Sequence, residues 1–258
     1  MSKDLNVSAV KVRDDEDGVR WVTFDRPEAS NAVTLADLDH LVELVGSPSN
    51  QPRAMVFTGT GTRCFSAGMH LKAITTLDTT LAREFITKNR NVLGAIRKAP
   101  FPTISAVNGY CLGFGFGVAL VSDIRIVADH ATFGLTEIKV GVPCVCDIAL
   151  LQQFVGLGKA KEMILTGDNY PATELPGLTN VLVPADRLMA ETQNMVARVA
   201  CHTKTVVAAQ KRLFEAWQNT GHAAGVEMSI EVFANVFGSE ETALQASKHK
   251  ESTGRRGK

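Results

Sequence analysis

Three stretches of the sequence combine residue types that could act on a carbonyl group. The segment Arg63-Cys-Phe-Ser-Ala-Gly-Met-His70 has small residues at 66–68, which permit a tight turn and bring a ligand close to backbone N–H groups. The segment Val107-Asn-Gly-Tyr-Cys-Leu-Gly-Phe-Gly-Phe-Gly-Val-Ala-Leu120 holds four glycines within nine positions and is predicted to lead into a helix. A third segment, Phe133–Pro143, carries Glu137 among largely apolar neighbours.

These residue types are suited to stabilising an enolate. The first turn of a helix has unpaired N–H groups, and two N–H groups that converge on one carbonyl oxygen form an oxyanion hole worth about 3–4 kcal/mol per donor. A carboxylate in apolar surroundings has a raised pKa and can move a proton near neutral pH. The glycines match neither a P-loop nor a dinucleotide fingerprint. Close helix packing by the glycines and a surface position for Glu137 beside Lys139 are the alternative interpretations.

Composition restricts the classes of function. The chain has 258 residues, enough for one sizeable domain, and its formal net charge of zero disfavours nucleic acid or a membrane surface as a partner. The five cysteines form no CxxC pair, which disfavours a structural zinc site or a disulfide framework. The N-terminal residues lack a long apolar run typical of a secretory signal. We therefore expect a cytoplasmic protein.

Apolar periodicity predicts an α/β fold with a parallel sheet and a mostly helical C-terminal third. The expected strands are 20–24, 54–58, 103–107 and 124–128. The expected helices are 35–45, 79–98, a segment after the glycine stretch that ends near 121, and then 147–155, 158–166, 186–201, 205–218, 222–236 and 240–249.

Taken together, these motifs resemble the crotonase superfamily, also called the enoyl-CoA hydratase/isomerase family. The resemblance runs in the same order along nearly the whole chain. It is carried by Phe24-Asp-Arg-Pro-Glu-Ala-Ser-Asn-Ala32, Phe65-Ser-Ala-Gly68, Ile104-Ser-Ala-Val-Asn-Gly-Tyr110, Ser122-Asp-Ile-Arg-Ile-Val-Ala128, Phe133-Gly, Glu137 through Gly141, Leu165-Thr-Gly167 and Gly177-Leu-Thr-Asn-Val-Leu-Val-Pro184.

The resemblance implies a crotonase-like ββα spiral that binds acyl-CoA over residues 1–190 and a helical trimerisation region over 191–258. It also implies an acyl-CoA thioester as substrate, as in fatty acid metabolism, and a homotrimer or a dimer of trimers. No metal or redox cofactor is expected, because coenzyme A arrives as part of the substrate.

By the same resemblance, the oxyanion hole consists of the backbone N–H groups of Met69 and Phe114, and Glu137 is the catalytic carboxylate. The coenzyme A adenine is expected near the Phe65–Leu71 loop, and the pantetheine along residues 29–32. The predicted substrate-binding residues are Ala29, Asn31, Ala32, Phe65, Ser66, Ala67, Gly68, His70, Leu71, Gly113, Gly115, Gly117, Pro143 and Cys144.

The sequence departs from the family pattern at three places. Gly117 stands where the hydratases carry a second glutamate, Cys144-Val-Cys-Asp-Ile148 replaces a glycine-rich turn, and His70 replaces an aspartate. A lone Glu137 favours isomerisation of the double bond of an enoyl-CoA. Hydration of that double bond, a lyase reaction, is the close alternative. Asp147 or His70 could assist, although Asp147 could instead cap a helix.

Two further alternatives stay open from the residues alone. A lone glutamate also resembles carboxymethylproline synthase, so decarboxylation with C–C bond formation, or hydrolysis of a β-diketone, would use similar residues. Loss of one glutamate is also compatible with an inactive protein that only binds coenzyme A.

Overall fold

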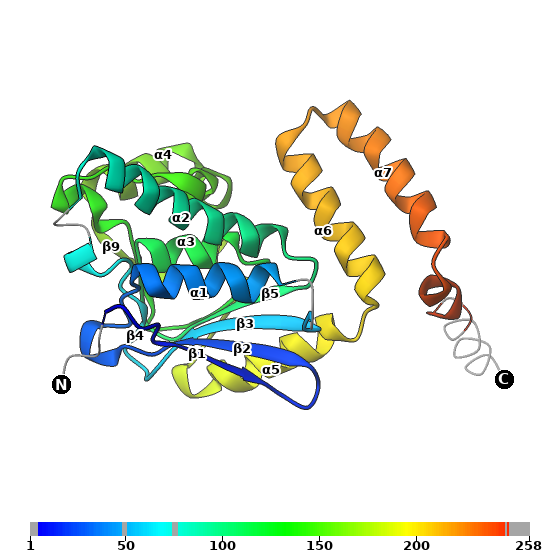
Figure 1. Cartoon of the computed structure of the whole chain (residues 1–258), viewed down its shortest axis with the longest axis horizontal. Helices are drawn as coiled ribbons and strands as arrows, with labels where there is room; N and C mark the ends of the chain where they lie inside the picture. Colours follow the sequence, from blue (N-terminus) through cyan, green and yellow to red (C-terminus); the bar gives the residue numbers. More distant parts are fainter. Residues whose placement is uncertain (1–4, 48–50, 74–76, 246, 248–258) are drawn as a thin grey trace.

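The computed structural model describes residues 5–47, 51–73, 77–245 and 247 (Figure 1). Its centre is a six-stranded sheet in the order β1-β2-β3-β5-β7-β10. β1 and β2 pair antiparallel, and every later pair in this sheet is parallel. The strands are β1 (Val10–Asp14), β2 (Val19–Phe24), β3 (Ala54–Gly59), β5 (Thr103–Val107), β7 (Ile124–Ala128) and β10 (Val181–Val183).

A smaller sheet consists of three-residue strands in the order β4-β6-β8-β9. The strands are β4 (Cys64–Ser66), β6 (Tyr110–Leu112), β8 (Thr132–Gly134) and β9 (Asn169–Pro171). β4, β6 and β8 run parallel, and β9 is antiparallel to β8. Each of these three parallel strands follows one strand of the large sheet and precedes a helix, so the chain repeats a ββα unit. This confirms the expected α/β spiral.

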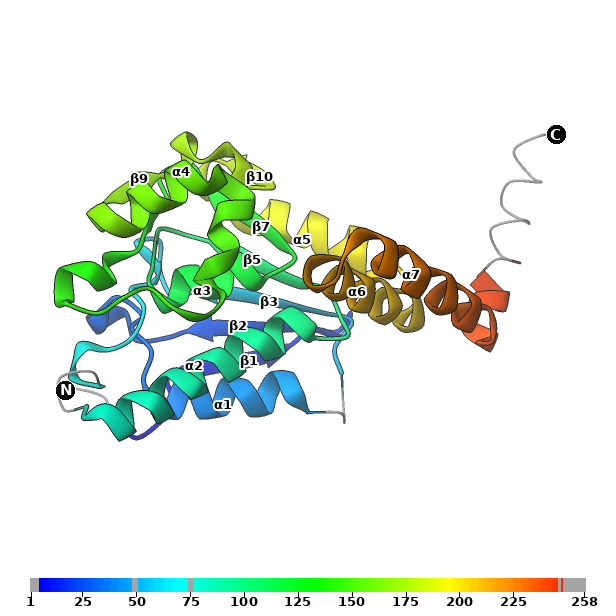
Figure 2. The same ribbon diagram turned by 90° about the horizontal axis from the view of Figure 1, so that it is seen from above.

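Helices cover both faces of the large sheet (Figures 1 and 2). α1 (Leu35–Gly46), α2 (Thr79–Lys98) and α3 (Phe114–Val121) lie on one side, and α5 (Leu188–Ala200) packs on β3, β5 and β7 from the other. All six residues of β3 are buried, as a strand covered on both faces requires. α3 is likewise buried along its whole length, which makes it the central helix of the domain.

Local sequence explains where the first helix starts. The Thr34 side chain accepts a hydrogen bond from the backbone N–H of Asp37, whose carboxylate accepts one from the backbone N–H of Thr34. This reciprocal cap satisfies two N–H groups that a helix start otherwise leaves unpaired. From there α1 buries Leu38, Leu41 and Val45 against the sheet layer.

The C-terminal helices leave the body of the domain as a hairpin. α6 (Lys204–Asn219) and α7 (His222–Phe237) contact each other extensively and extend away from the sheets (Figures 1 and 2). Gly225 is the only residue of α7 that is buried. Within the described part of the chain, no helix has the length and apolar character needed to cross a membrane.

The long elements agree with the sequence-based expectations, and the short ones were missed. α4 (Leu151–Thr166) bends at Gly156, where φ is 76°, which confirms the predicted break between two helical segments. Residues 147–150, expected to be α-helical, belong to a 3-10 helix, Cys146–Leu150. Residues 240–245 are helical, and part of the predicted helix 240–249 lies outside the described residues. The strands β1 and β10 and all strands of the small sheet are absent from the sequence-based expectations.

Candidate active site

Three loops that carry the predicted chemistry meet at one edge of the small sheet. β4, β6 and β8 are parallel neighbours, so their carboxyl ends lie side by side. Met69 lies three residues after β4, Phe114 two after β6, and Glu137 three after β8. The backbone N–H of Gly113 donates to the carbonyl oxygen of Gly134 at 3.1 Å, which ties the second loop to the third.

The backbone around Met69 turns its N–H away from the protein. The Val33 N–H donates to the carbonyl oxygen of Gly68, and the His70 N–H donates to the carbonyl oxygen of Val33, both at 2.8 Å. In this parallel bridge the groups on either side of Met69 face Val33, so the Met69 N–H faces the opposite way. Among the described residues it has no hydrogen-bond acceptor, and Met69 lines the cavity described below.

The second donor is the first residue of α3. The N–H of Phe114 has no acceptor within the helix, because the helical hydrogen bonds start with Gly117 N–H donating to Gly113. The turn that delivers it needs glycine: Gly113 has φ 52° and ψ −121°. The two donor loops touch, since a Cβ placed on Gly68 would lie 3.2 Å from the Phe114 nitrogen. The structure therefore brings both predicted donors together.

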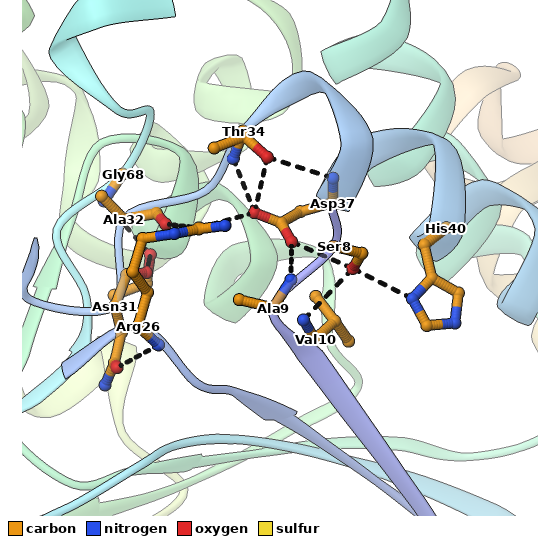
Figure 3. Close-up of polar contacts among 11 residues, drawn as sticks. Ser8, Ala9, Val10, Arg26, Asn31, Ala32, Thr34, Asp37, His40 and Gly68 are labelled. Carbon is orange, nitrogen blue, oxygen red and sulfur yellow. Dashed lines mark hydrogen bonds and ion pairs between the residues drawn. The ribbon is translucent and has the colours of Figure 1, made fainter. Parts of the chain in front are cut away.

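A buried ion pair fixes the strand segment that holds Met69 (Figure 3). Arg26 Nη1 lies 2.8 Å from Asp37 Oδ2 and also donates to the carbonyl oxygen of Ala32, next to Val33. Burial opposes ionisation of Asp37, but hydrogen bonds from Arg26 and from the backbone of Thr34 outweigh it, so the pKa of Asp37 is lowered. The Arg26–Asp37 ion pair is therefore maintained near neutral pH. The Arg26 hydrogen bond to Ala32 then holds the neighbouring Val33, which pairs with Met69.

Glu137 is the catalytic carboxylate candidate, and its surroundings favour the protonated form. Its backbone lies in the 3-10 helix Thr136–Val140, and its side chain is half-buried. Burial raises the pKa of Glu137, and hydrogen bonds from its own backbone and from the Cys144 thiol oppose this only in part. A Cβ on Gly113 would lie 3.0 Å from Glu137 Oε1, so the carboxylate reaches the oxyanion turn. A carboxylate with a raised pKa at this point can take and return a proton.

The two donors and Glu137 open into a single cavity of about 820 Å³. Its lining includes the Ala29–Ala32 segment, the Met69 loop, residues of α2 and the loop around Pro143. Among the described residues that line the cavity, only Asn89 is both polar and almost fully buried, and its amide nitrogen donates to the carbonyl oxygen of Phe85 at 2.9 Å. A cavity of this size and largely apolar lining suits an acyl chain.

Most of the predicted binding residues line this cavity, and the others support it. The lining ones are Ala29, Ala32, Ala67, Gly68, His70, Leu71, Gly113, Gly117 and Pro143, together with Met69, Phe114 and Glu137. Asn31, Phe65, Ser66, Gly115 and Cys144 are not part of the lining of this cavity among the described residues. Ser66 Oγ accepts a hydrogen bond from the Gly68 N–H at 3.2 Å, and Asn31 Nδ2 donates to the carbonyl oxygen of Cys64 at 2.7 Å, so both shape the turn.

The position at which the sequence lacks the second hydratase glutamate, Gly117, lies beside apolar side chains. Gly117 lines the cavity, and a Cβ placed on it would lie 3.2 Å from Leu93 Cδ1 and 3.8 Å from Ile148 Cδ1. Both neighbours also line the cavity, so the part of the lining around Gly117 is apolar. The sequence indicates that the glutamate is missing but not which residues lie beside Gly117, because contacts between distant segments leave no local signal.

The two residues predicted to assist lie in different surroundings. Asp147 pairs with Arg97, its Oδ1 lying 3.2 Å from Arg97 Nε, and Arg97 also reaches Glu215 on α6 at 3.0 Å. Asp147 does not line the cavity and makes no helix-capping hydrogen bond. His70 does line the cavity, and its Nδ1 accepts a hydrogen bond from the Lys72 N–H at 3.3 Å.

Comparison with known proteins identifies the family. Residues 14–253 match the enoyl-CoA hydratase/isomerase family. The crotonyl-CoA hydratase of Syntrophomonas wolfei is 30% identical over 86% of each chain, and the short-chain-enoyl-CoA hydratase of Clostridium acetobutylicum is 29% identical over 88% of each. The enoyl-CoA hydratase structure from Mycobacterium smegmatis superposes with a TM-score of 0.89, at 27% identity, over 95% of this chain and 96% of that one. The chain therefore belongs to the enoyl-CoA hydratase/isomerase family.

Proposed function

We propose that the protein isomerises an enoyl-CoA, moving a double bond from the 3,4 to the 2,3 position with Glu137 as the only acid–base residue. The observation that carries this proposal is that Glu137 is the only carboxylate among the described residues that line the cavity, so no second carboxylate there can hold an attacking water. Isomerisation needs one base that moves a proton between two carbons, which a single carboxylate can do.

The steps follow from the positions of the three groups. The thioester oxygen accepts hydrogen bonds from the N–H groups of Met69 and Phe114, so negative charge that develops on it is stabilised. Glu137 removes a proton from C2, the electrons delocalise over the thioester and the double bond, and the same carboxyl returns the proton to C4. The double bond then lies between C2 and C3, and no atom is gained or lost.

Coenzyme A enters this scheme as part of the substrate, and the proposed reaction uses no other cofactor. The Ala29–Ala32 segment and residues 67–71 line the cavity beside the donors, which supports a pantetheine path there. We place the reaction in fatty acid metabolism in the cytoplasm, without nucleic acid or membrane partners.

Hydration is the second candidate, and the names of two relatives favour it: both are called hydratases, one of them for crotonyl-CoA. The deciding experiment compares the isomerisation of 3-hexenoyl-CoA with the hydration of crotonyl-CoA under the same conditions. We expect isomerisation to be faster by at least about tenfold, because the water-holding carboxylate is missing. Faster hydration would contradict the proposed reaction. Turnover of malonyl-CoA in the same assays would instead support C–C chemistry, and binding without turnover would support an inactive protein.

We further propose that copies of the chain assemble through the C-terminal hairpin as a trimer or a dimer of trimers. The hairpin exposes large apolar side chains whose burial would be favourable: Phe214, Trp217, Val226, Met228, Ile230, Phe233 and Phe237. Sedimentation or light scattering at micromolar concentration should give three or six chain masses. A monomer would contradict the proposed assembly.

A further inference from the structure

We propose that Cys144 is a positioning residue for Glu137: its thiol holds one carboxylate oxygen, so that the other faces the substrate. This inference rests on the proposed role of Glu137 as the proton carrier. It concerns a residue on which the sequence departs from the family pattern and which does not line the cavity.

The two oxygens of the Glu137 carboxylate have different neighbours. Oε2 lies 3.6 Å from the Sγ atom of Cys144, a hydrogen-bonding distance for sulfur. Oε1 lies close to Gly113, since a Cβ added to Gly113 would be 3.0 Å from it. Gly113 belongs to the turn that presents the Phe114 N–H. The oxygen nearest the expected thioester is therefore left for proton transfer, while the other is anchored.

The direction of this hydrogen bond is fixed by the state of the thiol. Burial raises the pKa of Cys144 to about 12, and the neighbouring Glu137 carboxylate adds to the rise. The thiol is therefore protonated at neutral pH, and it donates to the ionised form of Glu137, because an ionised carboxylate can only accept. The same chemistry makes Cys144 a poor nucleophile, since attack requires the thiolate.

The other charged groups around Glu137 are engaged with different partners. No charged partner contributes to the raised pKa of Glu137 beyond burial, its own backbone and Cys144. Ionisable residues with partners of their own on the surrounding segments include Lys139, which pairs with Asp168, and Asp147, which pairs with Arg97. Of the ionisable residues that line the cavity with Glu137, His70 accepts a hydrogen bond from the Lys72 N–H, and the Cys146 thiol contacts the Ile86 carbonyl oxygen. Cys144 is thus the side chain that donates a hydrogen bond to this carboxylate.

Removing the donor should have two effects. The Glu137 side chain loses its anchor, and a misplaced base costs turnover by about tenfold or more. The pKa of Glu137 rises further, because the thiol favours the charged form against the effect of burial. A hydroxyl in place of the thiol keeps a donor at this position, so Cys144→Ser should retain both properties better than Cys144→Ala.

The test measures the Glu137 titration directly by ¹³C NMR of glutamate-labelled protein, with Glu137→Gln assigning the signal. In Cys144→Ala the titration should move to higher pH than in the wild type, and in Cys144→Ser it should not. The pH at which 3-hexenoyl-CoA isomerisation falls on the acid side should likewise be higher in Cys144→Ala and unchanged in Cys144→Ser. Thermal unfolding midpoints serve as the control that both variants are folded.

An unchanged Glu137 titration in Cys144→Ala would overturn the inference. So would an equal upward shift in the alanine and serine variants, which would indicate a packing effect. The titration does not depend on the substrate, so it separates this inference from the proposed function. If Glu137→Gln kept full turnover, the proposed function would fail even where the Cys144 titration result held.

Discussion

The backbone nitrogen of Phe114 lies beside Gly68, so close that a Cβ on Gly68 would stand 3.2 Å from it. Gly68 also has φ 89°, a backbone conformation that L residues rarely adopt. A side chain at residue 68 would therefore strain this turn and crowd the Phe114 nitrogen.

The first prediction concerns this contact. Gly68→Ala should lower turnover of the best acyl-CoA substrate by about 10²–10³-fold, the loss expected for one oxyanion donor. Gly61→Ala is the matched control, because Gly61 has φ 83° and no atom within 4 Å of an added Cβ. Steady-state kinetics of both variants measure the loss of turnover, and their thermal unfolding measures any loss of stability from backbone strain. Equal losses in both would indicate backbone strain instead of a blocked donor.

The second prediction concerns the missing glutamate. Gly117→Glu alone should destabilise the fold, because Leu93 occupies the space around the new Cβ. In a Gly117→Glu, Leu93→Ala double variant the added carboxylate has room, and hydration of crotonyl-CoA should rise above that of Leu93→Ala alone. An absence of any gain in the double variant would mean that the residue at position 117 does not decide between hydration and isomerisation.

A third prediction concerns the buried pair behind the Met69 loop. Asp37→Asn should cost about 3–5 kcal/mol of unfolding free energy, because it leaves the buried Arg26 without its counter-ion. The folded-state pKa of Asp37 is lowered, so its contribution to stability is present at neutral pH and is lost as pH falls through that pKa. Urea unfolding of the wild type and of Asp37→Asn should show a difference in unfolding free energy that becomes smaller toward acid pH. A free-energy difference that does not change with pH would exclude a contribution from the ionised Asp37 carboxylate.

The fourth prediction concerns Asp147, which pairs with Arg97 and does not line the cavity. Asp147→Asn should lower stability slightly and leave the pH dependence of turnover unchanged. A shifted pH profile would assign Asp147 a direct part in proton transfer, as one interpretation of the sequence allows.

The sequence predicted the long elements and the residue types of the site, because apolar periodicity and glycine patterns are local signals. It could not predict the small sheet, since strands as short as Cys64–Ser66 and Thr132–Gly134 carry no periodicity. Yet these strands explain the site, because their parallel pairing brings the loops of Met69, Phe114 and Glu137 together.

The sequence also did not predict contacts between segments that are far apart along the chain. The contact of Cys144 with Glu137 depends on how the loop after Pro143 folds back, and the packing of Leu93 on Gly117 depends on how α2 crosses α3. The family pattern indicated where this chain differs from its relatives. The structure gives the atoms that replace the missing groups.

The most direct test of the central claim is the pH dependence of 3-hexenoyl-CoA isomerisation by the wild type, by Glu137→Gln and by the exposed control Glu174→Gln. The wild type should lose activity as pH falls through the raised pKa of Glu137, because the base must be ionised. Glu137→Gln should be slower by about 10²–10⁴-fold at every pH, and Glu174→Gln should match the wild type. Near-native turnover by Glu137→Gln would contradict the account.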